Sequence, residues 1–260
     1  MQQRLTVAPS QLPTDQRHAA TRKRVLDVVV ASALTLLTAP LVLVLAIGVA
    51  ITLRAWPVFS HWRIGQHGRP IRVFKLRTLP TSTPPYADKF ELQIEDLPLP
   101  WLCRVLRRTH IDELPQLWLV VAGKMSMVGP RPVQGPDIEP VPETFSALRS
   151  AIRPGCTGLW QISEASGGTA TSAPEYDRFY IDKASVRFDL WILARTVGWM
   201  LCLIKPVTID DIPRWVRGVG LASEGHEVSI DPRHKRHLVE LVTQHVQALE
   251  DDASLASIGD

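Results

Sequence analysis

Two adjacent carboxylates set among arginines form the segment of this chain best suited to chemistry. Asp112 and Glu113 follow Arg107 and Arg108, and Arg131 comes a short distance further along. Neighbouring carboxylates suit a nucleophile or the ligation of a divalent cation, while arginines suit bidentate capture of phosphate oxygens. Both halves of a phosphoryl-transfer site therefore lie close together in the sequence, although an Asp-Glu pair alone is also a common surface feature.

The same segment carries a signal for the start of a helix. Pro115 is compatible with the first turn of a helix, because its missing N–H would have no partner there. The sequence predicts a helix that contains residues 116–118 and begins near Asp112. The carboxylate pair would then lie at the positive end of the helix dipole, which stabilises ionised carboxylates and favours an incoming phosphate or its metal complex.

Three strings resemble, in their order, the bacterial sugar transferases, which are small monotopic polyprenyl-phosphate sugar-1-phosphate (phosphoglycosyl) transferases. The strings are Asp-Glu-Leu-Pro-Gln-Leu at 112–117, Met-Ser-Met-Val-Gly-Pro-Arg-Pro at 125–132, and Arg-Pro-Gly-Cys-Thr-Gly-Leu-Trp-Gln at 153–161. The resemblance extends from about Lys23 to Ile204.

The resemblance implies transfer of a sugar-1-phosphate from a nucleotide diphosphate sugar to polyprenyl (undecaprenyl) phosphate, a step that initiates glycan or exopolysaccharide assembly. Asp112 would be the nucleophile that forms a phospho-aspartate intermediate, and Mg²⁺ would bind through Asp112 or Glu113. Arg153 precedes a Pro-Gly turn, so a purely structural role is its alternative. The residues expected to contact the substrate are Lys75, Arg77, Arg107, Arg131, Arg153 and Gln161.

Two positions depart from the family pattern. Lys124 stands where the family has an aspartate, and Ala165 stands where an arginine is common. An alternative function is therefore a catalytically weakened relative that acts as a membrane-bound scaffold or substrate-binding partner in a glycan assembly complex. The intact Asp112–Glu113 pair favours an active enzyme. His110, which precedes the pair, is expected not to be catalytic.

An uncharged stretch from Val28 to Leu53 predicts membrane association. As one straight helix it would measure about 39 Å, enough to cross a hydrocarbon core of about 30 Å. Pro40 interrupts the stretch and basic residues flank both ends, so we expect a re-entrant helix-break-helix over residues 21–54, as the resemblance also implies. A kinked single-span anchor is the alternative. Asp27, at the edge of the stretch, is expected to pair with Lys23 or Arg24.

The remaining segments complete a mainly α fold with a small β-hairpin. Residues 1–20 predict a flexible tail, and residues 55–205 a catalytic domain on the cytoplasmic face of the cytoplasmic membrane. Within that domain, residues 58–78 predict a hairpin, residues 86–94 a short helix, and residues 189–204 an interfacial amphipathic helix, with a buried globular helix as the alternative. Residues 206–260 predict an extension with an accessory helix from Asp231 and an acidic tail.

Composition and charge exclude several other classes. A net charge of +3 without a basic stripe or a known motif gives no support for nucleic acid as a partner. The three cysteines, Cys103, Cys156 and Cys202, are far apart and fit reduced thiols in the cytoplasm. No GxGxxG, P-loop, HExxH or GxSxG string is present. The expected partners are a nucleotide sugar, polyprenyl phosphate, membrane lipids and a second copy in a homodimer.

Overall fold

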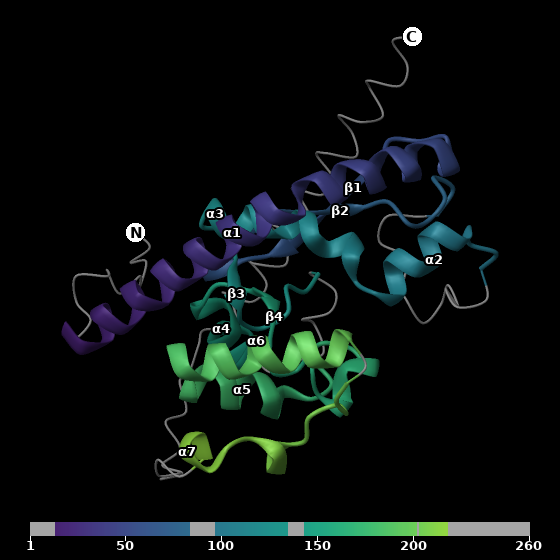
Figure 1. Ribbon diagram of the computed structural model, residues 1–260. Coiled ribbons are helices and arrows are strands. Elements are labelled where there is room, and N and C mark those ends of the chain that lie inside the picture. Colours follow the sequence, from purple (N-terminus) through teal and green to yellow (C-terminus); the bar gives the residue numbers. More distant parts are fainter. Residues whose placement is uncertain (1–13, 84–96, 135–142, 202, 218–260) are drawn as a thin grey trace.

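A computed structural model describes residues 14–83, 97–134, 143–201 and 203–217 (Figure 1). The helix expected at residues 86–94 and the helix and acidic tail expected beyond Asp231 lie outside these ranges. The helices and strands are α1 (Thr14–Leu53), β1 (Val58–Ile64), η2 (Gln66–Gly68), β2 (Pro70–Leu76), α2 (Trp101–Arg108), η4 (Ile111–Gln116), α3 (Leu117–Val121), β3 (Ser126–Val128), α4 (Glu143–Ala151), β4 (Gly155–Thr157), η6 (Glu164–Gly167), α5 (Pro174–Lys183), α6 (Val186–Met200), η7 (Ile209–Asp211) and α7 (Arg214–Arg217).

Helix α1 is a single α-helix of 40 residues with Pro40 inside it. The predicted break into two helices is therefore not observed. A proline removes one backbone hydrogen bond, and this loss does not unwind a helix whose two halves are each held against the rest of the chain. Residues 14–20, which the sequence assigns to the N-terminal tail, belong to α1. Residues 20–53 are long and apolar enough to cross a membrane, judged by length and composition alone.

Both ends of the apolar stretch of α1 pack against the same domain. In Figure 1, α1 runs along the upper side of the molecule, with β3 and β4 below it and α5, α6 and α7 further away. Ala31 is buried in the main core, and Val49 is buried with Leu76 and Leu106 in a second cluster. The middle of the helix exposes large apolar side chains, namely Leu36, Leu37, Leu41, Leu43, Val44 and Ile47.

The predicted hairpin is confirmed. Strands β1 and β2 pair antiparallel, with His61 opposite Val73 and Phe59 opposite Lys75. Paired residues and their neighbours two positions along lie on the same face of a sheet, so His61, Lys75 and Arg63 share one face. The hairpin thereby brings three nitrogen-bearing side chains to one surface.

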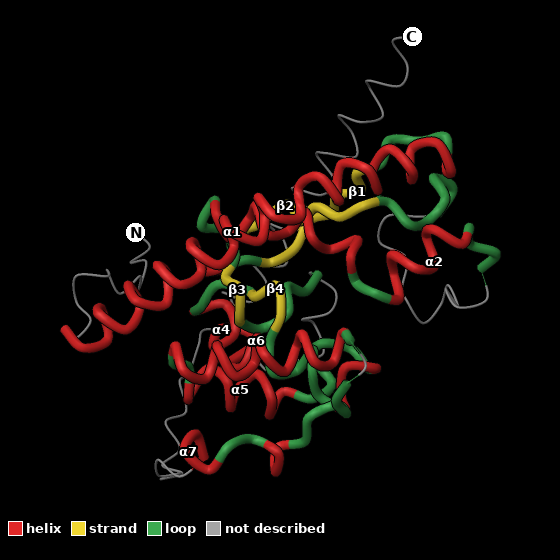
Figure 2. Tube along the Cα trace, viewed as in Figure 1, coloured by secondary structure: helices red, strands yellow, loops and turns green. Residues whose placement is uncertain are grey.

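A second, parallel pair of strands lies at the centre of the fold (Figure 2). Ser126 of β3 pairs with Gly155 of β4. The two backbones approach so closely around Gly129 that a Cβ added to Gly155 would collide with the Gly129 nitrogen, and one added to Gly158 would collide with the Gly129 carbonyl. Glycine is required at these positions because only a residue without a side chain permits the approach.

Helices α5 and α6 cover the main core on the side away from the hairpin. Phe188 and Ile192 of α6 are fully buried, and Phe188 lies against Tyr180 of α5 with ring centroids 5.9 Å apart. The opposite side of α6 exposes Leu190 and Val197, which are 50% and 57% accessible. The expected helix of residues 189–204 therefore exists with earlier bounds, packed on a core as in the globular alternative while keeping an apolar outer face.

Candidate active site

The carboxylate pair lies in the first turn of η4, as predicted, but this turn is a 3₁₀-helix that leads into α3 rather than the start of an α-helix. Pro115 has no N–H to bond back along the chain, and the α-helical hydrogen bonds begin only beyond it, in α3. His110 precedes the turn in a left-handed conformation with φ of 55°. This conformation redirects the chain at the end of α2, so that Asp112 is buried while Glu113 is partly accessible.

Burial and neighbouring charges shift the pKa values of the two carboxylates in opposite directions. Burial, and then the neighbouring Glu113, raise the pKa of Asp112 to about 6 against the opposing pull of Lys75 and Arg107. Burial also acts to raise the pKa of Glu113, but the positive charges of Arg131, Lys75 and His110 outweigh it and leave that pKa below its usual value. Glu113 is therefore ionised at neutral pH, and Asp112 binds its proton more readily than an ordinary aspartate.

The hairpin supplies basic groups to the same place. Burial lowers the pKa of Lys75, and the nearby Glu113 and Asp112 oppose that shift. His61 is 7% accessible, and burial together with Arg63, Lys75 and Arg131 lowers its pKa to about 2. The imidazole therefore stays neutral beside three cations.

Arg131 reaches the pair from the segment that follows β3. Its guanidinium Nη2 lies 3.9 Å from Glu113 Oε1. The backbone around it is held from three directions: Arg149 Nη2 donates to the Arg131 carbonyl at 2.9 Å, the Ile64 N–H to the Val133 carbonyl at 2.9 Å, and the Gly155 N–H to the Pro130 carbonyl at 2.9 Å. Fixing the backbone in this way limits where the Arg131 side chain can reach.

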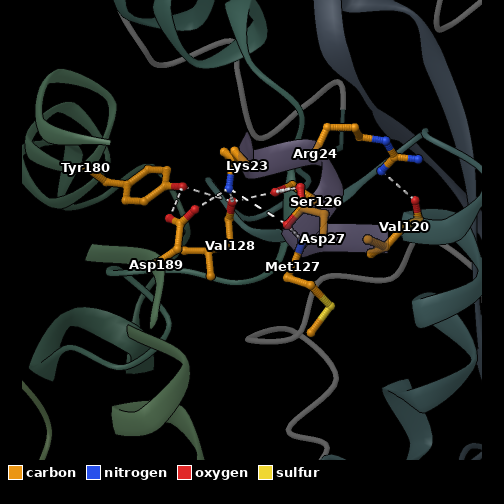
Figure 3. A network of polar contacts seen from close by, with 9 residues as sticks. All are labelled: Lys23, Arg24, Asp27, Val120, Ser126, Met127, Val128, Tyr180 and Asp189. Carbon is orange, nitrogen blue, oxygen red and sulfur yellow. Dashed lines mark hydrogen bonds and ion pairs between the residues drawn. The ribbon is translucent and has the colours of Figure 1, made fainter. Parts of the chain in front are cut away.

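A buried polar network ties this segment to α1 (Figure 3). The Val128 carbonyl accepts hydrogen bonds from Lys23 Nζ at 3.1 Å, Tyr180 Oη at 3.0 Å and Ser126 Oγ at 2.9 Å. Lys23 also forms an ion pair with Asp189 of α6 at 2.6 Å. The first turns of α1 thereby anchor the strand that leads to Arg131.

The expected ion pair of Asp27 with Lys23 is confirmed, but it is not the closest contact of this carboxylate. Lys23 lies 3.9 Å from Asp27, but the shorter contacts are with Ser126 Oγ at 2.8 Å and the Met127 N–H at 3.1 Å. Arg24 instead donates to the carbonyls of residues 120 and 121. The carboxylate faces the protein, so its burial is compensated by β3 rather than by an interfacial cation.

One pocket collects much of the predicted site. Four of the predicted residues, Lys75, Glu113, Arg131 and Gln161, line it. Asp112 is buried next to Glu113, and Arg107, which donates to Thr78 Oγ1 at 3.1 Å, lies near enough to influence its pKa. The full lining is His61, Arg63, Val73, Lys75, Glu113, Gln116, Arg131, Pro132, Gly155, Cys156 and Gln161.

Two predicted substrate contacts are directed elsewhere. Arg77 Nε donates to the Trp56 carbonyl at 2.9 Å, and Arg153 Nε donates to the Gly123 carbonyl at 2.9 Å. Neither lines the pocket, and the Arg153 bond matches its structural alternative. Sequence reasoning also missed His61. The signal that could have located it is the two-residue period of the first strand, which places it on the same face as Arg63.

The donor set suits magnesium. Among the described residues no group of three or more His, Cys, Asp or Glu side chains gathers around a common point. Mg²⁺ retains several waters and is commonly bound by one or two carboxylates together with substrate phosphates. Asp112 and Glu113 are the two carboxylates that could hold such an ion here.

The site thus combines a buried Asp112 and a partly accessible Glu113 with facing cations, beside a helix whose middle exposes apolar side chains. The sequence model of the family described as bacterial sugar transferase matches residues 18–202, and the chain belongs to this family.

Several named proteins are similar to this chain over most of the region that the family model matches. The chain is 39% identical over 187 residues to the UDP-glucose:undecaprenyl-phosphate glucose-1-phosphate transferase of Caulobacter vibrioides, a match that covers 69% of this chain and 70% of the relative. It is 32% identical over 194 residues to the UDP-galactose-lipid carrier transferase of Erwinia amylovora, covering 69% of this chain but 40% of that protein. It is 31% identical over 197 residues to the exopolysaccharide production protein ExoY of Rhizobium meliloti, covering 70% and 86%.

Proposed function

We propose that this chain transfers a sugar-1-phosphate from a nucleoside diphosphate sugar to polyprenyl phosphate, such as undecaprenyl phosphate, and thereby initiates the assembly of a glycan. The observation that carries the proposal is the Asp112–Glu113 pair in the first turn of η4, with Asp112 buried and Glu113 lining a pocket together with Lys75, Arg131 and Gln161. The names of the relatives support the two substrate classes.

The chemistry proceeds in two displacements at one phosphorus atom. A carboxylate oxygen of Asp112 attacks the β-phosphorus, and the bond from that phosphorus to the oxygen bridging it to the α-phosphate breaks, so the nucleoside monophosphate leaves with the electron pair. The sugar phosphate remains on Asp112 as an acyl phosphate. An oxygen of polyprenyl phosphate then attacks the same phosphorus, and the Asp112 carboxylate is released.

The neighbouring residues support both steps by compensating the negative charge of the phosphates. Lys75 and Arg131 offset the charge of the diphosphate, and Arg107 lies beside Asp112. Glu113 stays ionised and, together with Asp112, would hold Mg²⁺. When bound, the metal neutralises charge on the phosphate oxygens. The raised pKa of Asp112 gives a more basic carboxylate, which favours its attack on phosphorus once it is ionised.

The arrangement of α1 supports a monotopic association with the cytoplasmic membrane, in which the unbroken helix lies along one face of the bilayer. At about 1.5 Å per residue its 40 residues extend about 60 Å, twice the thickness of a hydrocarbon core. A helix crossing the membrane would leave one end far from the domain, whereas Ala31 and Val49 both pack on it. The apolar face between them, with Trp56 and Trp101 each 74% accessible nearby, suits burial in one leaflet.

The two departures from the family pattern lie outside the pocket. Lys124 is exposed at the surface, and Ala165 packs against the main core. Neither is among the residues that line the pocket. This favours an active enzyme over the weakened scaffold.

The test is release of nucleoside monophosphate by the purified full chain in detergent or vesicles, supplied with Mg²⁺, undecaprenyl phosphate and a panel of nucleotide sugars. We expect turnover with at least one donor, and loss of turnover when the lipid phosphate is left out. Absence of nucleoside monophosphate with every donor, from protein that remains folded, would refute the proposed function.

A further inference from the structure

Two uncharged polar side chains that line the pocket carry buried atoms without hydrogen-bond partners in the part of the chain that the structure describes. They are His61, whose Nδ1 is unpaired, and Gln161, whose amide oxygen and nitrogen are both unpaired. A buried polar atom without a partner costs about 1–3 kcal/mol, so such atoms are rare in native structures. All three atoms belong to residues that line one pocket, where a bound ligand would complete their hydrogen bonds.

The chemistry of these groups differs from that of their neighbours. Arg63, Lys75 and Arg131 in the same lining are cations that suit phosphate oxygens. A neutral imidazole offers one donor and one acceptor, and a primary amide offers donors and an acceptor together. Groups that both donate and accept match hydroxyls, which do the same, whereas a phosphate needs donors alone.

We propose that His61 and Gln161 form the subsite for the hydroxyl groups of the donor sugar, and that they contribute to the choice of the sugar that is transferred. This inference rests on the proposed function. The sugar is bonded directly to the phosphate that Asp112 attacks, so a phosphate held by Lys75 and Arg131 places the ring within the same pocket. The nucleobase is separated from that phosphate by a second phosphate and a ribose.

The cations also explain why a histidine at this position stays uncharged. Arg63, Lys75 and Arg131 surround the ring, and Phe59 stacks on it with centroids 5.5 Å apart. A protonated imidazole would lose its acceptor and would be repelled by three neighbouring charges. The imidazole of His61 therefore stays in its neutral form, which can hydrogen-bond to a hydroxyl as either donor or acceptor.

The experiment compares full-length wild type with His61→Phe and Gln161→Met, which keep size but lose hydrogen bonding. The donor that the panel identifies is assayed beside its epimers, with UDP-glucose and UDP-galactose as the first pair, and the released nucleoside monophosphate is tested as an inhibitor. We expect the donor KM to rise about tenfold for each lost hydrogen bond, and the ratio of kcat/KM between epimers to change. The KM for undecaprenyl phosphate and the inhibition constant of the nucleoside monophosphate should stay within about twofold.

Further variants separate this role from a purely structural one. His61→Asn retains a donor and an acceptor, so it should recover part of the donor KM while still altering the epimer ratio. His67→Asn, at an exposed histidine in the turn of the same hairpin, should change neither quantity.

Two outcomes would overturn the subsite. One is an equal weakening of nucleoside monophosphate inhibition and donor binding, which would assign the groups to the nucleotide. The other is an unchanged donor KM and epimer ratio in folded His61→Asn and Gln161→Met. Wild type that is inactive with every donor would instead refute the proposed function itself.

Discussion

At the scale of single residues, Asp112 and Glu113 are neighbours in the chain but have different protonation behaviour. The pKa of Asp112 rises to about 6 while that of Glu113 falls below its usual value, because Arg131 and Lys75 lie close to the glutamate. Carboxylates whose environments push their pKa values apart can take different roles. We therefore assign nucleophilic attack to Asp112 and charge compensation or proton acceptance to Glu113.

Replacing Glu113 by glutamine should slow turnover without preventing formation of the proposed covalent intermediate. Loss of a proton acceptor or metal ligand is expected to lower kcat by about 10² to 10⁴. Glu175→Gln, at an exposed position on α5, is the matched control and should retain wild-type turnover. Steady-state release of nucleoside monophosphate provides the measurement. Wild-type kcat in Glu113→Gln would remove Glu113 from the site.

His61 should make the fold sensitive to acid. Its pKa is about 2 in the folded protein against an ordinary 6.5, so below pH 6.5 the unfolded chain binds a proton that the folded chain does not. The free energy of unfolding should then fall with decreasing pH by up to about 1.4 kcal/mol per unit from this group. Thermal unfolding at pH 5 and 7.5 should show a smaller loss for His61→Asn than for wild type. Equal losses in both would contradict the burial of a neutral imidazole.

Sequence strings located Asp112, Glu113, Arg131 and Gln161 because these residues lie within short, distinctive segments. His61 could not be located in the same way, since its place in the pocket depends on the pairing of β1 with β2. The sequence shows that Arg77 and Arg153 are charged, but it does not show which groups accept their hydrogen bonds. The backbone carbonyls that engage Arg77 and Arg153 come from elsewhere in the chain.

At the scale of elements, the hairpin and the apolar helix were predictable because each has a strong local pattern. The short strands β3 and β4 were not, because their pairing joins distant segments through close glycine contacts. The uninterrupted course of α1 through Pro40 depends on tertiary contacts at both ends, which periodicity does not reveal.

Breaking the link between α1 and α6 should destabilise the protein. Lys23→Met would leave Asp189, which is 1% accessible, as a buried charge without its ion-pair partner, at a cost of about 3–5 kcal/mol. Adding Asp189→Asn should recover part of that loss. Thermal unfolding of wild type, both single variants and the double variant gives the coupling free energy between Lys23 and Asp189. Strictly additive effects would contradict a direct interaction between the two elements.

At the scale of the whole molecule, the N-terminal end of α1 and the domain that carries the pocket should lie on the same side of the membrane. Single cysteines at Ala20 and Arg69, both exposed, can be introduced after replacing the native cysteines. In intact cells a membrane-impermeant thiol reagent should label neither, and after permeabilisation it should label both. Labelling of one position alone from outside the cell would establish a true span and exclude the monotopic arrangement.

The most direct test of the proposed mechanism is to trap the enzyme with nucleotide sugar and Mg²⁺ in the absence of polyprenyl phosphate. Mass spectrometry should find one sugar phosphate attached to Asp112, together with a stoichiometric burst of nucleoside monophosphate. Asp112→Asn, whose amide cannot form the acyl phosphate, should give neither adduct nor burst while keeping its fold and membrane association. An active wild-type enzyme that releases no nucleoside monophosphate until lipid is added, or substantial turnover in Asp112→Asn, would contradict the covalent mechanism.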